Sequence, residues 1–146
     1  MKVIPLSTEE AARSGFTHVV NIKNTDLAAG GVATGNQSVI QNIMPVPVGT
    51  LIRKAVLDVK TAWAGQTNPI LQVGVAATST AASGIVAGFT ATAVSIVQGV
   101  GTDILVSTAS QFITINNVVS TTAATAGEAN LLIQVIDVTL PRNSFA

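Results

Sequence analysis

The clearest alternation of apolar and polar side chains lies near the start of the chain, over residues 16–23. Successive side chains of a β-strand point to opposite faces, so a period of two predicts a strand with one buried face. Phe16, His18, Val20 and Ile22 share one face, and three of the four positions between and after them are polar. The segment is therefore predicted to be a half-buried strand.

The residues before this strand, 1–15, are predicted to form an N-terminal arm with one helical turn. Ser7 and Glu10 have the spacing of a capping box, in which the two residues satisfy each other's free backbone N–H groups at a helix start. Gly15 is expected to end the turn, since glycine readily adopts the positive φ found after a helix.

The rest of the chain reads as short strands separated by turn residues. Val, Ile and Thr dominate over Leu and Phe, and such β-branched side chains pack well on a pleated sheet. Seven further strands are predicted, over 38–44, 51–61, 70–75, 85–98, 103–107, 111–119 and 129–140. Eight strands at this spacing predict an all-β fold, an eight-stranded antiparallel sandwich of jelly-roll type over 16–140, with a C-terminal tail at 141–146.

The last predicted strand, 129–140, is apolar on both faces. A sandwich strand with one face in water is expected to alternate apolar with polar residues. This strand therefore indicates either a neighbouring subunit over one face or a central strand covered by the chain's own loops. The residues proposed for a subunit interface are Leu132, Ile136, Val138 and Leu140, together with Trp63. Trp63 is expected either to anchor that interface or to plug one end of the sandwich.

Charge is scarce and unevenly spread. Charged residues make up 10% of the chain, whereas soluble proteins average about a quarter. Residues 61–102 contain none at all. A surface so poor in ionic groups offers little resistance to association, which favours a structural or binding protein over an enzyme.

The same composition argues against several other classes. Basic and acidic residues cancel, and no basic cluster exceeds the pair Arg53 and Lys54, so no nucleic-acid partner is expected. No run of about 18 apolar residues occurs, so no membrane partner is expected either. The chain has no cysteine, which excludes disulfides and thiolate metal sites.

No catalytic or metal-binding pattern is apparent. His18 is the one histidine and falls on the predicted core face, which favours a structural role over that of a general base. The acidic residues are scattered, without the alternating carboxylates of a calcium loop. We expect no enzyme activity, no cofactor and no metal.

Four segments together resemble small virion proteins of tailed bacteriophages: 44–50 (MPVPVGT), 56–63 (VLDVKTAW), 71–74 (LQVG) and 122–138. In that family an "lpaGt" turn enters a "vxldvttaf" strand, followed by "ltvG" and a closing "taGeaxvxv" strand. The resemblance spans residues 40–140 and rests on turn-and-strand patterns. Trp63 stands where the family pattern has Phe.

The resemblance is closest to the jelly-roll head decoration, or cement, proteins. It implies a homotrimer that binds the major capsid protein on the outside of the virion and stabilises the mature shell. Such a protein would be made in the cytoplasm of the bacterial host. The resemblance implies shell contact by the arm, through Lys2, Val3, Ile4, Pro5, Leu6 and Arg13. The alternatives are a frayed N-terminus and, for function, a tail- or fibre-associated virion protein that recognises a host surface.

Overall fold

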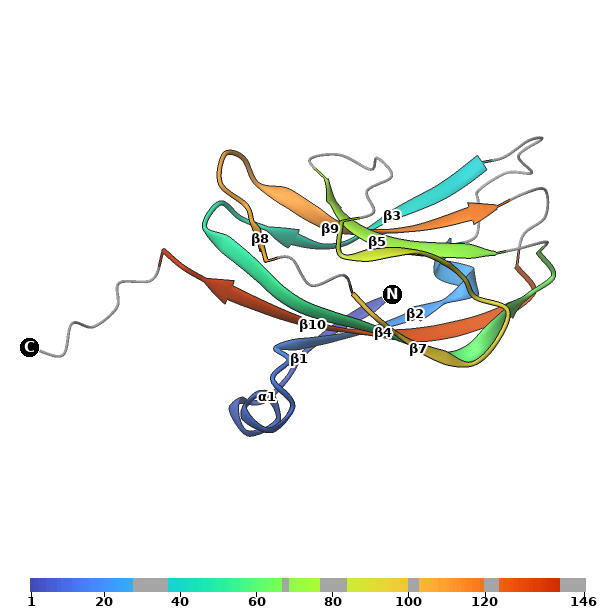
Figure 1. Ribbon diagram of the computed structural model, residues 1–146, viewed down its shortest axis with the longest axis horizontal. Coiled ribbons are helices and arrows are strands. Elements are labelled where there is room, and N and C mark those ends of the chain that lie inside the picture. The colour runs from blue at the N-terminus through green and yellow to red at the C-terminus, as the bar shows by residue number, and fades with distance from the viewer. Residues whose placement is uncertain (28–36, 67–68, 77–83, 100–102, 120–123, 140–146) are drawn as a thin grey trace, which may run out of the picture.

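In a computed structural model, the described residues are 1–27, 37–66, 69–76, 84–99, 103–119 and 124–139. They form two antiparallel β-sheets that face each other, with one short helix beneath the lower sheet in Figure 1. The mostly-β sandwich expected from the sequence is confirmed. Within the described residues, none of the helices has the length and apolar character that crossing a membrane requires.

One sheet, called sheet A, has the strand order β1-β2-β10-β4-β7, and β8 also pairs with β4. Its strands are β1 (Lys2–Pro5), β2 (His18–Lys23), β10 (Ala126–Asp137), β4 (Thr50–Ala64), β7 (Ser95–Gln98) and β8 (Ile104–Leu105). The other sheet, called sheet B, has the order β3-β9-β5-β6. Its strands are β3 (Gln37–Val46), β9 (Gln111–Val119), β5 (Ile70–Ala76) and β6 (Val86–Thr90).

The core lies between the two sheets and follows the period of two. On β10, Ala129, Leu131 and Ile133 are fully buried, while the residues between them are half-buried on the outer face. Ile113 and Ile115 of β9 face them from sheet B. Burying an aliphatic side chain of this size is worth about 1.5–3 kcal/mol, so this alternation supplies much of the driving force for folding.

The N-terminal arm is not a free extension. Residues Lys2–Pro5 form β1, which pairs with β2 from Lys2 opposite Asn21 to Pro5 opposite His18. The predicted helical turn is confirmed as α1 (Thr8–Ser14), with the complete capping box between Ser7 and Glu10 and with Gly15 at φ 74° after its end. The 3-10 helix η1 (Asn24–Leu27) follows β2.

The predicted strand 85–98 is two strands. β6 belongs to sheet B and β7 to sheet A, and residues 91–94 cross between the sheets. The crossing is held by Ala91, whose N–H donates to the carbonyl of Pro69 and whose carbonyl accepts from the N–H of Trp63. With β1 added and this segment divided, the described chain has ten strands where the sequence pattern predicted eight.

Candidate interaction surfaces

Charge is divided between the two sheets. The strands of sheet A hold Lys2, Lys23, Arg53, Lys54, Asp58, Lys60, Glu128 and Asp137, whereas β3, β5, β6 and β9 of sheet B hold no charged residue. The remaining described charges lie in α1, in η1 and at Asp103, just before β8. One sheet of the sandwich is therefore ionic and the other is neutral.

The charged and polar residues of sheet A form a ladder across its outer face. Asn21 on β2 lies opposite Asn130 on β10, which lies opposite Asp58 on β4. The Asn21 Nδ2 donates to Asn130 Oδ1 at 3.0 Å and to Glu128 Oε1 at 2.8 Å, and Asp58 forms an ion pair with Lys60. These groups satisfy one another, so the ladder stabilises strand register and is not arranged as a catalytic site.

Two aliphatic rows run beside this ladder on the same outer face. The register places Ile4, Val19, Leu132 and Val56 side by side across β1, β2, β10 and β4. A second row joins Ile136 of β10 to Leu51 of β4 and Leu105 of β8. Ile4 and Leu105, at the ends of the rows, are exposed, while the residues between them are half-buried.

The predicted subunit-interface residues divide between three environments. Leu132 and Ile136 lie half-buried in the aliphatic rows, and Val138 follows the strand with half its surface exposed. Leu140 lies outside the described residues. Trp63 is only 2% exposed and belongs to the core cluster, so it is not an interface anchor in this chain. The subunit contact over the outer face of β10 stays a prediction.

The burial of Trp63 depends on Gly127 at the start of β10. Gly127 has φ 151°, and a Cβ there would lie 2.5–2.9 Å from three atoms of the Trp63 ring. The ring therefore lies flat against bare backbone, which explains both the glycine in the resembled closing motif and the position of Trp63 at the end of the sandwich. Its burial in the core cluster agrees with the expected end plug.

The predicted capsid-contact residues do not all face outwards. Lys2, Ile4 and Pro5 of β1 are exposed, and Arg13 projects from α1, where it pairs with Glu9 at 2.8 Å. Leu6 is half-buried between β1 and α1, and Val3 packs against the core opposite Val20. Pairing of β1 with β2 turns Val3 inwards, and shell contact by the arm stays a prediction.

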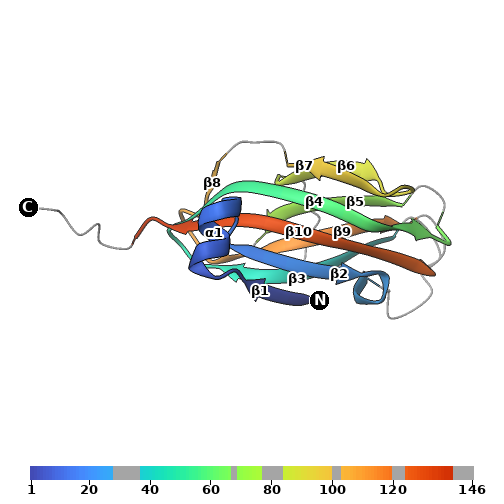
Figure 2. The ribbon, with the colours of Figure 1, turned by 90° about the horizontal axis from the view of Figure 1, so that it is seen from below.

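The α1 helix has no buried residue and projects from the outer face of sheet A (Figures 1 and 2). Hydrogen bonding to Ser7 lowers the pKa of Glu10, which keeps the capping carboxylate ionised. The ring of Phe16, just after the helix, is buried beneath the ammonium group of Lys54, with Nζ 4.6 Å from the ring centroid. This contact anchors the base of α1 to β4.

His18 is placed as a structural residue. It is half-buried on β2, and its Nδ1 lies 2.9 Å from the Thr17 hydroxyl. Burial lowers the pKa of His18, so the neutral imidazole is favoured. Thr17 Oγ1 also accepts from the Val135 N–H at 3.0 Å and lies 3.2 Å from the Ile133 carbonyl, which ties β2 to β10.

The acidic residues are also structural where the geometry shows their partners. Burial acts to raise the pKa of Asp26, but hydrogen bonds from the N-terminal ammonium and the Lys23 N–H outweigh it, so that pKa lies below its usual value. Among the described residues, no three His, Cys, Asp or Glu side chains gather as a metal site would require.

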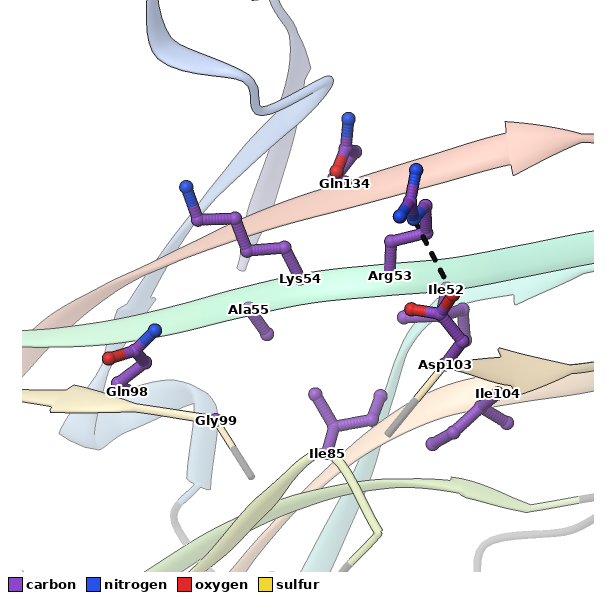
Figure 3. Close-up of a pocket in the computed structure, with 10 residues that line it drawn as sticks. All are labelled: Ile52, Arg53, Lys54, Ala55, Ile85, Gln98, Gly99, Asp103, Ile104 and Gln134. Carbon is purple, nitrogen blue, oxygen red and sulfur yellow. Dashed lines mark ion pairs between the residues drawn. The ribbon is translucent and has the colours of Figure 1, made fainter. Parts of the chain in front are cut away.

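A hollow of about 340 Å³ lies beside β4, between β7 and β8 (Figure 3). Its lining residues are Ile52, Arg53, Lys54, Ala55, Ile85, Gln98, Gly99, Asp103, Ile104 and Gln134. Arg53 and Asp103 form an ion pair across its rim at 3.5 Å. The lining has two cations, one carboxylate and two amides, and the carboxylate of Asp103 is held by the ion pair with Arg53.

An exposed apolar pair, Val94 just before β7 and Ile96 on it, was not found by sequence reasoning. Val94 and Ile96 are 68% and 73% exposed, more than the other large apolar side chains of the described chain. The sequence offered one sign of this surface, because β7 lies inside the uncharged stretch 61–102. Only the division of the predicted strand 85–98 into β6 and β7 places these residues at an edge.

Comparison with models of known families, with curated proteins and with solved structures finds no match to this chain.

Proposed function

We propose that this protein is a structural component of a phage virion, which binds the outside of the capsid as a decoration protein and stabilises the mature shell. The observation that carries the proposal is the division of charge between the two sheets. A neutral sheet suits permanent packing against protein, because no ionic group has to lose its water when surfaces meet, and the exposed aliphatic residues Ile4, Ile96 and Leu105 lie on strands of sheet A. The four motifs that resemble phage virion proteins supply the identity of the partner.

The proposal includes a jelly-roll topology, which the strand pairing supports. Leaving out β1 and β8, the pairs are nested: β2 with β10, β3 with β9, β4 with β7, and β5 with β6. Nested antiparallel pairs of this kind arise when one long hairpin is rolled up. The pairs β10 with β4 and β9 with β5 then join the roll into two four-stranded sheets, which β1 and β8 extend.

The proposed shell contact is the outer face of sheet A around α1. This helix has seven residues, and so short a helix is not stable in water without support. It is nevertheless fixed by caps at both ends while none of its side chains is buried. A capped helix that contributes nothing to the core is typical of an element kept for a partner. Ile4, Lys2 and Arg13 lie on or beside this face.

The test is binding to expanded capsid shells that lack the protein. We expect it to co-sediment with mature shells, to leave unexpanded shells unbound and to raise the temperature at which mature shells lose their contents. Ala12→Asp on α1 is expected to weaken binding, with Thr61→Ser, an exposed and conservative change, as control. Labelled-antibody microscopy that places the protein on the tail would overturn the proposal and favour the host-recognition alternative.

A further inference from the structure

The two long sides of the sandwich are protected very differently. Strands at the edge of a sheet present unpaired N–H and C=O groups, and natural proteins usually blunt such edges with charge, proline or a covering segment. One side consists of β1 and β3, and the other of β6 and β7 (Figure 2). The comparison of these sides indicates which one is left open for pairing.

The side formed by β1 and β3 carries the usual protective residues. Lys2 and Pro5 lie in β1, and Pro45 lies in β3. Proline has no N–H to offer to an incoming strand, and a lysine would be brought close to the partner sheet and lose water. Pairing along this side is therefore disfavoured.

The described residues of the side formed by β6 and β7 carry neither charge nor proline. Residues 84–99, which include both strands, contain no charge and no proline. Among the described residues β7 pairs with β4 alone, and β6 with β5 alone. Ile96, with 73% of its surface exposed, lies on β7 opposite Asp58, and Val94 precedes it on the same face. Edge strands that hold neither charge nor proline, with exposed aliphatic residues beside them, are a predicted pairing site.

We propose that the β6–β7 side is where this chain binds a second copy of itself, with Val94 and Ile96 in the contact. Copies related by rotational symmetry bring the same residues together near the axis, so a charge on this strand would meet its own equivalents. Like charges on facing strands are destabilising, and the uncharged segment 84–99 avoids them. This self-association deepens the proposed function, because it names the surface through which copies would assemble. It rests on the proposed function only where the shell is concerned.

The test is sedimentation velocity of the purified chain at micromolar concentration, without shells. We expect a stable oligomer for the unchanged protein. Ile96→Lys should weaken self-association by about tenfold or more, because it replaces an exposed aliphatic side chain in the contact with an ammonium group that must lose its water there, while Asp58, opposite on β4, already pairs with Lys60. The matched control is Val48→Lys, an exposed apolar residue in the turn before β4, at the opposite end of that strand from the β7 pairing. This control should remain oligomeric.

The thermal unfolding of both variants establishes that they fold, as expected for such exposed positions. A monomeric unchanged protein, or an Ile96→Lys variant as oligomeric as the control, overturns the self-association inference. Shell binding is measured separately. An unchanged protein that is monomeric yet binds shells refutes the inference and leaves the proposed function intact, whereas an oligomer that ignores shells does the reverse.

Discussion

Gly127 and Trp63 show how a single backbone position controls the packing of the largest side chain. The ring of Trp63 occupies the space where a Cβ of residue 127 would be, and φ 151° is a conformation that residues with a Cβ rarely adopt. The indole Nε1 is buried and has no hydrogen-bond partner among the described residues, so these residues hold the ring by packing. Trp63 is therefore sensitive to any change in the volume beside it.

Gly127→Ala is expected to lower the free energy of unfolding by about 2–4 kcal/mol, from steric overlap with Trp63 together with backbone strain. Urea denaturation measures the change. Gly15→Ala is the matched control, since Gly15 also has a positive φ but a Cβ there would meet nothing within 4 Å. Equal losses in both variants would show that strain alone matters and that Trp63 does not require the glycine.

Thr17 joins β2 to β10 through its side chain, since its hydroxyl accepts a hydrogen bond from the backbone N–H of Val135. Thr17→Val keeps the shape but removes the hydroxyl that accepts from the Val135 N–H, so it should cost about 1–2 kcal/mol of stability. Thr61→Val, at an exposed position on β4, is the control and is expected to change stability by less than about 0.5 kcal/mol. A Thr17 variant as stable as this control would contradict the assigned bond.

His18 gives stability a dependence on pH. Because burial lowers its pKa below the ordinary 6.5, the unfolded chain binds a proton more readily than the folded chain. Stability should therefore fall as the pH decreases through 6.5 and towards the folded pKa. In His18→Gln this slope should vanish, as followed by urea midpoints from neutral to mildly acidic pH. An unchanged slope would assign the effect to other groups.

At the level of elements, the sequence predicted correctly those features that depend on neighbouring residues alone. The capping box of α1 and the strand 111–119 have the bounds and features that the residues indicate. What failed were features that depend on distant partners. The alternation that continues through 85–98 gives no sign that the chain changes sheets at Ala91, because the bonds to Pro69 and Trp63 decide it. Likewise, only the presence of β2 makes residues 2–5 a strand.

The α1 helix should unfold independently of the sandwich, since none of its residues is buried. Ser7→Ala removes the cap and is expected to raise amide hydrogen exchange in α1 several-fold while exchange in β4 and β10 stays unchanged. Ser95→Ala, outside the helix, is the control. If the proposed shell contact is correct, Ser7→Ala also weakens shell binding. Loss of protection in the core strands would instead show that α1 supports the fold.

At the scale of the whole molecule, the sequence revealed that charge is scarce but not how it is arranged. The uncharged strands are far apart in the sequence. Only the strand order shows that β3, β9, β5 and β6 form one sheet without charge and that β6 and β7 lie on the same side of the sandwich. The sequence thus predicted that the surfaces available for binding would be poor in charge and rich in aliphatic residues, but it did not predict where on the fold they lie. The predicted residues around α1 and β10 lie on sheet A, and the β7 edge was missed.

The two proposed contacts should respond to salt in opposite ways. Raising the salt concentration from about 0.1 M to about 1 M shortens the range of electrostatic interaction from about 10 Å to about 3 Å. The proposed shell contact includes Lys2 and Arg13, so shell binding should weaken over that range. The strand that carries Ile96 has no charged residue, and burial of apolar surface does not depend on ionic attraction, so self-association should persist or strengthen. Sedimentation of the free protein and of shell mixtures across the series measures both. Self-association that dissolves in salt would place an ion pair in the contact, which the uncharged segment 84–99 cannot supply by itself, and would move the copy–copy interface to the charged strands of sheet A.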